Sequence, residues 1–323
     1  MKRVVALLAA ATVATTTVAC GGGAEPGAPE RATLVLDFQP NAVHAGIYAA
    51  LEQGYYRDAG VDVNVQQPSS STDAPKLLEA GKAQFAILDI HDLAIARERG
   101  FDLVGVVPIV QRPLAAVIGG DQGSVHRPRD LEGRTVGVTG LPSDDAVLDS
   151  VVAADGGDPS NVHRVTIGFN AVAALAAGRV DAATAFWNAE GVTLKRQGVR
   201  TTTFRVDDYG APRYPELVLV TTERTLADEP SLVRAVAEAT TRGYALAVDR
   251  PQSALDDLLA ADPSLERSDQ RAELHALDAA GAFRPPGRFD LAALQRWSRW
   301  EVDHGIVKER PDVAAIFKAG DSG

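Results

Sequence analysis

The sequence contains a single cysteine, Cys20, among 323 residues, and its uncharged apolar run, residues 4–19, is shorter than a typical membrane span. A lone cysteine excludes an internal disulfide and any metal site built from several thiolates. Stability must therefore come from burial of apolar residues. Hydrophobic residues make up 46% of the chain, which is long enough for two domains.

The short motifs typical of nucleotide binding and catalysis are also missing. There is no GxGxxG or GxxxxGK[ST] loop to cradle a phosphate, no GxSxG to present a serine and no HExxH to bind zinc. The six histidines show no metal-ligand spacing. The net charge of -11 gives no electrostatic basis for binding nucleic acid or anionic lipid headgroups. We therefore expect a non-catalytic protein with no cofactor, no metal and no nucleic-acid partner, although active sites are defined by geometry rather than by motif.

The first thirty residues have the organisation of an export signal followed by a tether. Lys2 and Arg3 precede the uncharged run, as in a secretory signal peptide, and Cys20 follows the run directly. We expect residues 1–19 to be removed and Cys20 to be lipidated, which would hold the protein on the extracytoplasmic face of the cell membrane. The alternative is a signal peptide with an incidental cysteine, since Thr17 departs from the aliphatic residue usual in a lipidation signal. Residues 20–31 read as a flexible tether.

From Thr33 onward, short apolar runs alternate with helical patterns, which predicts parallel strands in doubly wound α/β lobes. We assign residues 32–118 and 217–323 to a first lobe and residues 119–216 to an inserted second lobe. Two chain crossings between the lobes predict a hinge with a cleft between them. The tail of the first lobe is mainly helical, and Tyr244, Trp297 and Trp300 are expected to be core residues rather than ligand contacts.

The stretch from Leu34 to Asp62 is predicted to form a strand, a polar turn, a helix and the start of a second strand. Asn41 is placed to cap the helix, and Val43 and Ile47 fall on one helical face. In an open α/β sheet, ligands bind beyond the carboxyl ends of strands, near helix N-termini. We therefore expect this turn to form one wall of a small-molecule pocket, with residues 186–190 as the opposing wall.

Polar and aromatic side chains gather at the predicted carboxyl ends of strands in both lobes. Such a set suits a flat aromatic ligand held between rings while polar groups read its edge. Asn41 and Asp89 are equally consistent with helix caps, His44 with a packing residue, and Ser143 is also a good N-cap. The candidate ligand-binding residues are Asp37, Phe38, Asn41, His44, Asp89, His91, Gln111, Ser143, Phe186, Trp187, Asn188, Glu190 and Tyr209.

Several blocks of the sequence resemble one known family. LDFQPNAVHAGIYAALEQGYYRDAGVDV is similar to the opening signature LDWxPNxxHxGxYxAxxxGYYxxxGLDV of the THI5/SsuA-like (NMT1) group of substrate-binding proteins. Later blocks of the same group resemble GKAQFAILDIHDLAIARERGFDLVGVVPIVQRPLAAV, AALAAGRVDAATAFWNAEGV and DDYGAPRYPELVLVTTE. The resemblance covers about residues 33 to 230, and the blocks occur in the family's order.

The resemblance implies a type II periplasmic-binding fold and a monomeric, exported component of an ABC importer that docks on a permease. It also implies a substituted aminopyrimidine, salvaged as a thiamine precursor, as the ligand. Phe38 stands where the family has tryptophan and would stack on the ring, and Glu190 would accept a hydrogen bond from the exocyclic amine. The family's SYQxD is replaced here by LDIHD.

Two alternatives stay open at this point. A protein of the same class could bind riboflavin, another heterocycle or a sulfonate, for which Ser143 and residues 69–72 would supply hydroxyl groups. One branch of the family is a pyridoxal phosphate-dependent pyrimidine synthase, and His91 falls at the position of a histidine that this branch uses. That branch also carries a cysteine-rich iron site just before the returning strand, where this chain has no cysteine.

Overall fold

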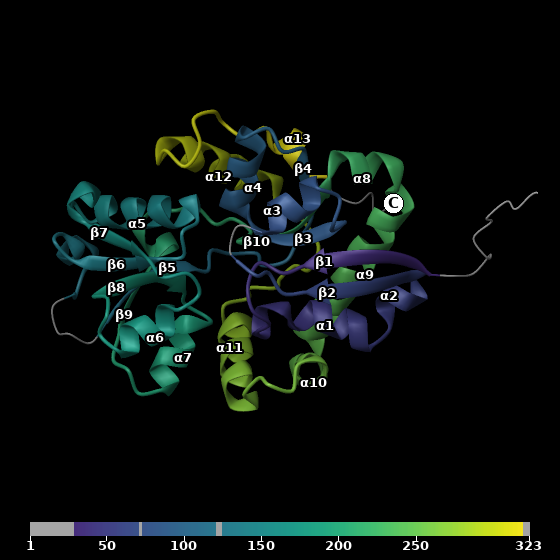
Figure 1. The fold of residues 1–323 in the computed structure, drawn as a ribbon, viewed down its shortest axis with the longest axis horizontal. Coiled ribbons are helices and arrows are strands. Elements are labelled where there is room, and N and C mark those ends of the chain that lie inside the picture. Colours follow the sequence, from purple (N-terminus) through teal and green to yellow (C-terminus); the bar gives the residue numbers. More distant parts are fainter. Residues whose placement is uncertain (1–28, 71–72, 121–124, 319–323) are drawn as a thin grey trace, which may run out of the picture.

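The computed structural model describes residues 29–70, 73–120 and 125–318, and the described residues form two α/β lobes that lie side by side (Figure 1). The signal, Cys20 and most of the tether lie outside the described residues. Lobe 1 contains strands β1 (Glu30–Val35), β2 (Val61–Gln66), β3 (Phe85–Asp89), β4 (Leu103–Pro108) and β10 (Leu217–Thr222). Its helices are α1 (Ala45–Glu52), α2 (Tyr55–Asp58), α3 (Asp73–Glu79), α4 (Ile90–Glu98), α8 (Glu223–Asp228), α9 (Pro230–Asp249), α10 (Pro251–Ala261), α11 (Arg267–Ala279), α12 (Leu291–Asp303) and α13 (Val313–Ile316), with the 3₁₀ turn η1 (Ala42–His44).

Lobe 2 has the same plan on a smaller scale, with helices on both faces of its sheet (Figure 1). Its strands are β5 (Ala115–Gly119), β6 (Thr135–Val138), β7 (His163–Thr166), β8 (Ala182–Phe186) and β9 (Thr202–Arg205). Its helices are α5 (Pro142–Ala154), α6 (Ala171–Ala176) and α7 (Glu190–Arg196), with the 3₁₀ turns η2 (Pro128–Leu131), η3 (Pro159–Asn161) and η4 (Val206–Tyr209). No helix within the described ranges combines the length and apolar character needed to cross a membrane.

Each lobe is built on a five-stranded sheet in which one inserted strand runs against its neighbours. The strand order is β2-β1-β3-β10-β4 in lobe 1 and β7-β6-β8-β5-β9 in lobe 2. The pairs β1–β2, β1–β3, β6–β7 and β6–β8 are parallel, as the alternating sequence pattern predicts, whereas β10 and β5 pair in the antiparallel sense. Both antiparallel strands adjoin the crossings between the lobes, so each enters its sheet from the hinge side.

Two predicted boundaries need correction. The division at residue 118 assigned the run 115–118 to lobe 1, but β5 pairs with β8 and β9 and so belongs to lobe 2. An apolar run of this kind fits either sheet, and only the pairing decides. The tether was predicted to extend to residue 31, but β1 begins at Glu30, which pairs with Val61.

The hinge consists of residues 109–114 and 210–216, and one buried carboxyl group joins its two segments. Oε2 of Glu216 accepts hydrogen bonds from the backbone amides of Leu114 and Ala115. Gln111 fixes the first segment to the loop before α12, because its Nε2 donates to the carbonyl oxygens of Pro285, at 2.7 Å, and Arg288. The crossings are therefore held by specific hydrogen bonds rather than by chain length alone.

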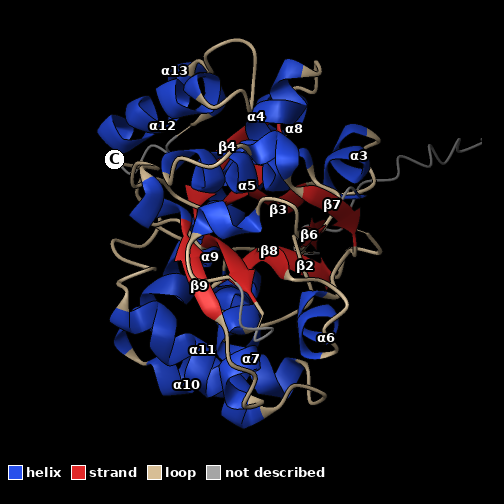
Figure 2. Ribbon diagram, turned by 90° about the vertical axis from the view of Figure 1, so that its left-hand side faces the viewer, coloured by secondary structure: helices blue, strands red, loops and turns tan. Residues whose placement is uncertain are grey.

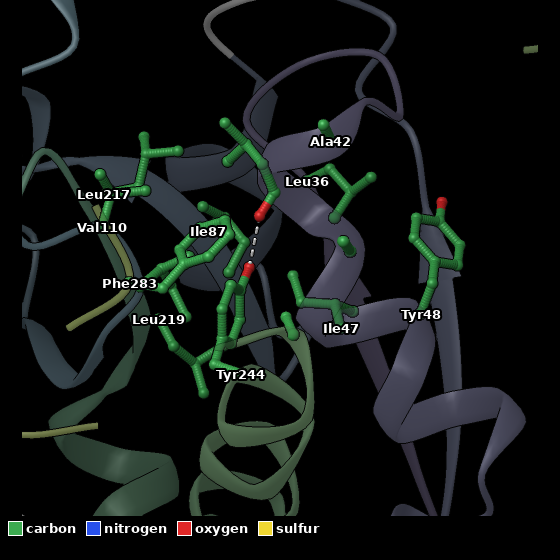
Figure 3. Close-up of a cluster of buried hydrophobic side chains, with 14 of the residues drawn as sticks. Leu36, Ala42, Ile47, Tyr48, Ile87, Val110, Leu217, Leu219, Tyr244 and Phe283 are labelled. Atoms are coloured by element: carbon green, nitrogen blue, oxygen red, sulfur yellow. Dashed lines mark hydrogen bonds between the residues drawn. The ribbon is translucent and has the colours of Figure 1, made fainter. Parts of the chain in front are cut away.

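The turn after β1 rests on helix α9 from the far end of the chain (Figure 3). The hydroxyl of Tyr244 donates a 2.8 Å hydrogen bond to the carbonyl oxygen of Val43 inside the core. Helices α1 and α9 pack closely because both carry glycine at the contact: a Cβ on Gly243 would lie 2.0 Å from the carbonyl oxygen of Gly46. The predicted core position of Tyr244 is confirmed, as are those of Trp297 and Trp300.

Helix α11 is the part of the tail that reaches across to lobe 2. Figures 1 and 2 both show α11 beside α7, and the guanidinium group of Arg196 in α7 pairs with Asp269 and donates to Ser268 in α11. We call this contact the α7–α11 seam. The tail was expected only to pack on lobe 1, so a bridge to lobe 2 is an addition that helical periodicity does not reveal.

Candidate functional site

A cleft of about 100 Å³ opens between the lobes at the carboxyl ends of β1, β3, β6 and β8. Its apolar walls include Pro68, Leu88, Leu141 and Val147, and its aromatic side chains are Phe38, Phe169 and Phe186. The rings of Phe38 and Phe169 meet across the lobes edge to face, with centroids 4.4 Å apart. Both lobes therefore contribute aromatic surface to the same small cavity.

The lobe 1 wall is the predicted turn after β1. Asn41 caps the turn, since its side chain accepts from the amide of Val43 at 2.9 Å. Nδ1 of His44 accepts from the amide of Asn41 at 3.2 Å, so Nε2 carries the proton and donates to Asp37 at 2.9 Å. His44 is fully buried behind the cleft as a neutral ring that orients the carboxylate of Asp37.

Two further carboxyl groups in lobe 1 come from the β3–α4 junction. Asp89 caps α4 by accepting from the amide of His91 at 2.7 Å. The alternative prediction, that Asp89 is a helix cap, is therefore confirmed. Asp92, one helical turn further on, accepts from the hydroxyl of Ser143 in lobe 2 at 3.0 Å. The predicted N-cap role of Ser143 is wrong: Leu141 occupies the N-cap and Ser143 lies inside the first turn of α5, where its hydroxyl links the lobes.

The lobe 2 wall adds Asp144 and Glu190. Asp144 accepts from both the backbone amide and the hydroxyl of Thr139, and Glu190 accepts from the amide of Phe186 at 3.1 Å. Glu190 begins α7, where the helix dipole favours a carboxylate. Both groups are thus fixed at the cleft by backbone donors rather than by basic side chains.

The electrostatic environment of the cleft is acidic. Five carboxyl groups line it, from Asp37, Asp89, Asp92, Asp144 and Glu190, and among the described residues no lysine or arginine lines it. Burial raises the pKa of Asp89, Asp92, Asp144 and Glu190 above the ordinary carboxyl range, and neighbouring carboxyl groups add to the effect. The cleft therefore disfavours anions and holds protons that a free carboxyl group would have lost.

Glu273 of α11 lies behind Glu190. Glu273 is 3% exposed, and its Oε1 accepts from the hydroxyl of Thr193 in α7 and from the side-chain amide of Gln270 in α11, each at 3.4 Å, while the backbone amide of Ala42 in η1 lies close to the carboxyl group. Burial, with added repulsion from Glu190, raises the pKa of Glu273 to about 8. This carboxyl group contacts the first turn of lobe 1 and the first helix after β8 in lobe 2, so it sits where the two walls meet.

The structure divides the candidate residues into two sets. Those that line the cleft are Asp37, Phe38, Asn41, Asp89, Ser143, Phe186 and Glu190. Those that do not line it are His44, His91, Gln111, Trp187, Asn188 and Tyr209. Contact between the first set and a ligand stays a prediction.

The second set has structural roles for identifiable reasons. The indole of Trp187 is buried and donates to the carbonyl oxygen of Pro113 in the hinge at 3.0 Å, while the guanidinium of Arg205 stacks on its ring. Tyr209 packs edge to face on Phe204. Asn188 is fully buried beside Trp187, and its side-chain amide has no hydrogen-bond partner among the described residues. All three follow a strand end, but their side chains point away from the cleft.

His91 belongs to a buried polar network rather than to the cleft surface. Its Nδ1 contacts Glu301 and its Nε2 lies 3.0 Å from the hydroxyl of Tyr214. Burial acts to lower the pKa of His91, but Glu301 and Asp89 outweigh it and raise the pKa to about 10. Asp89, His91 and Glu216 place one donor atom each within 4.8 Å of the others, yet a metal ion there would have to displace existing partners of His91 and Glu216.

Two acidic cleft residues, Asp92 and Asp144, are missing from the candidate ligand-binding residues; they sit in the first turns of α4 and α5. Phe169 follows β7 at the carboxyl end of the strand, and its contact with Phe38 depends on how the lobes meet. Asp92 and Asp144 are each within a few residues of a strand's carboxyl end, so including the first helical turn after each strand would have found them.

Residues 41–254, about two thirds of the chain, match the family described as NMT1/THI5 like. The chain belongs to this family. A formylaminopyrimidine-binding protein from Halalkalibacterium halodurans is 35% identical over 231 residues, which cover 71% of this chain and 70% of that protein.

Family members named as enzymes are more distant in sequence. A 4-amino-5-hydroxymethyl-2-methylpyrimidine phosphate synthase from Legionella pneumophila is 24% identical over 238 residues, which cover 73% of this chain and 75% of that enzyme. The alkanesulfonate-binding protein SsuA from Xanthomonas axonopodis pv. citri, solved bound to MOPS, superposes with a TM-score of 0.73 over 92% of this chain and 100% of that chain, at 16% identity. That structural match shows the fold, which is the two-lobed type II periplasmic-binding fold.

Proposed function

We propose that this family member is the extracytoplasmic substrate-binding lipoprotein of an ABC importer and captures a thiamine pyrimidine precursor between its two lobes. The observation that carries the proposal is the interlobe cleft, in which aromatic rings from both lobes accompany carboxyl groups, hydroxyls and the side-chain amide of Asn41. The similarity to a formylaminopyrimidine-binding protein supports the same ligand class.

The cleft suits a substituted aminopyrimidine in shape and in chemistry. Phe38, Phe169 and Phe186 offer faces and edges for a flat ring. The exocyclic amine of such a ligand has two N–H donors, and Glu190 is the acceptor fixed for it by the amide of Phe186. The pair of Asp92 and Ser143 would close over the ligand from opposite lobes.

Two rival functions fit the cleft less well. A sulfonate is an anion that needs donors and positive charge, whereas the described lining presents five carboxyl groups and no basic side chain. A pyrimidine synthase that uses His91 needs that ring at the cleft, but the ring is fully buried with both nitrogens close to protein partners.

The export signal, the lipid on Cys20 and the permease are parts of the proposal that rest on sequence. Lys2, Arg3 and the run to residue 19 support export, and the position of Cys20 supports lipidation. Mass spectrometry of the mature protein from membranes of its host would test both. A diacylated N-terminal cysteine is the expected result, and a mature chain that begins elsewhere with an unmodified thiol would contradict it.

Calorimetry tests the ligand class directly. The protein lacking residues 1–20 is titrated with the hydroxymethyl, aminomethyl and formylaminomethyl derivatives of 4-amino-2-methylpyrimidine, and with ethanesulfonate. We expect at least one pyrimidine to bind with a dissociation constant of about 1 μM or below, and the sulfonate not to bind. Absence of binding to all three pyrimidines, or preferential binding of the sulfonate, would refute the proposed ligand class.

A further inference from the structure

The polar lining of the cleft carries one sign of charge from both lobes. Asp37, Asp89 and Asp92 come from lobe 1, and Asp144 and Glu190 from lobe 2. Across the described lining there is no arginine or lysine to balance them. The hydrogen bonds of His44 require its neutral form, so the ring next to Asp37 adds no positive charge.

Additional carboxyl groups lie behind the lining residues. Glu190 faces Asp37 from the β1 turn, Asp144 from α5 and Glu273 from α11. Further carboxyl groups stand behind the lobe 1 wall: Glu216 in the hinge lies beside Asp89, and Glu301 of α12 contacts His91.

This cluster cannot be fully ionised when the lobes close. Near the lobe 1 wall, Nδ1 of His91 is already paired with Glu301, so the charge of that ring is not available to the lining carboxyl groups. Carboxyl groups that share an enclosed space keep protons unless a cation replaces them. The raised pKa values of the lining carboxyl groups reflect this lack of positive charge in the cleft. A bound cation would supply the missing charge.

We propose that the cleft binds its ligand as a cation: a basic nitrogen heterocycle protonated on a ring nitrogen, or a heterocycle bearing an ammonium group, with Glu190 as the carboxylate that faces the charge. This inference rests on the proposed function only for the heterocyclic nature of the ligand. A 4-aminopyrimidine is an amidine-like base, and in its protonated form a ring N–H and an exocyclic N–H lie side by side. That pair of parallel donors matches the two oxygens of one carboxylate.

The proton balance differs between the two ligand forms. A neutral aminopyrimidine takes its proton from a carboxylic acid of the empty cleft, so one proton moves from oxygen to ring nitrogen and none is exchanged with solvent. An ammonium ligand arrives charged, so the carboxylic acid that becomes its partner releases a proton to solvent. Titration of both ligands in two buffers of different ionisation enthalpy distinguishes these cases.

The decisive measurement is the protonation state of the bound ring. A pyrimidine labelled with ¹⁵N in the ring is observed by NMR in the complex, at a pH at which the free ligand is neutral. We expect the ring nitrogen to show the large upfield shift of a protonated azine in the wild-type complex. Glu190→Gln, which keeps the acceptor for Phe186 but loses the charge, should abolish that shift and weaken binding by roughly thirtyfold or more. Asp145→Asn, which alters the exposed neighbour of Asp144 on α5, is the matched control.

A panel of simple probes on the wild-type protein keeps the inference testable without any variant. We expect 4-aminopyridine, a cation at neutral pH, to bind, and benzenesulfonate not to bind. Binding of 4-aminopyridine without any pyrimidine would refute the ligand named in the proposed function and uphold the cationic cleft. A pyrimidine bound in its neutral form would uphold the function and overturn this inference. Failure of all these ligands to bind would overturn both.

Discussion

Glu273 offers a direct test of how the lobes meet behind the cleft. Its side chain is 3% exposed at the contact of α11 with α7 and η1, and burial raises its pKa from 4.5 to about 8, with repulsion from Glu190 adding to the effect. One pKa unit corresponds to ~1.4 kcal/mol, so burying the ionised form costs on the order of 5 kcal/mol. Glu273→Gln keeps the shape of the side chain and removes this cost.

The direction in which the free energy of unfolding changes with pH follows from proton binding. The pKa of Glu273 is higher in the native protein than in the unfolded chain, so between pH 4.5 and about 8 the native state binds the extra proton. The free energy of unfolding therefore falls as the pH rises through that window, and the loss is complete above the native pKa. We expect wild type and Glu273→Gln to differ little at the acidic end, and the variant to be more stable by roughly 3–5 kcal/mol at the basic end.

Urea unfolding followed by tryptophan fluorescence, repeated across that window, measures the difference. Glu238→Gln on the exposed face of α9 is the matched control, because it neutralises a solvated carboxylate in the same lobe. The reasoning fails if the gain of Glu273→Gln is independent of pH, since Glu273 would then have an ordinary pKa. It also fails if Glu238→Gln gives the same pH-dependent gain, since the effect would then reflect net charge alone.

Three further changes test contacts elsewhere. Gly243→Ala places a methyl group 2.0 Å from a carbonyl oxygen of α1 and should destabilise the protein by about 1–3 kcal/mol or more in thermal melts, whereas Gly191→Ala, whose added Cβ would meet nothing closer than 3.5 Å, should not. Arg196→Ala and Asp269→Ala each break the α7–α11 seam; in stopped-flow experiments each should speed ligand release by a few fold and the double variant no more than either, at a cost in stability of about 1 kcal/mol or less. Ser143→Ala removes an interlobe hydrogen bond and should weaken ligand binding by roughly two- to tenfold in calorimetry, and unchanged affinity would show that the bond is absent in the bound state.

The elements of the fold follow from local pattern, and their pairing does not. The alternation of short apolar runs with helical patterns predicts the α/β lobes and the mainly helical tail, and Asn41 is confirmed as a cap. The same pattern does not determine that β5 crosses into lobe 2 or that β10 runs antiparallel, because a buried central strand is apolar on both faces in either sheet. Register and partner are set by contacts distant in sequence.

The candidate site, too, was predictable in part from local sequence pattern and in part was not. Position at a strand end identified residues such as Asp37 and Glu190, because the carboxyl ends of parallel strands share one edge. It could not tell Phe186, which lines the cleft, from Trp187 and Asn188, which do not, since those two residues follow the end of β8, where the alternation of a strand no longer applies. It also could not place His91, whose orientation is fixed by Glu301 from the far end of the chain.

The tail that reads as packing also determines the geometry of the ligand wall. The turn after β1 has no regular ladder of its own, and its shape depends on Tyr244 of α9, which donates to the carbonyl oxygen of Val43, and on α11, whose Glu273 lies close to the amide of Ala42. Both side chains contact the short turn η1, which begins one residue after Asn41 and ends with His44. Because His44 in turn orients Asp37, the cleft carboxylate nearest the N-terminus is positioned by residues more than 200 positions away in sequence. The lobe 1 wall of the cleft therefore takes its shape only when the returning chain has packed against it.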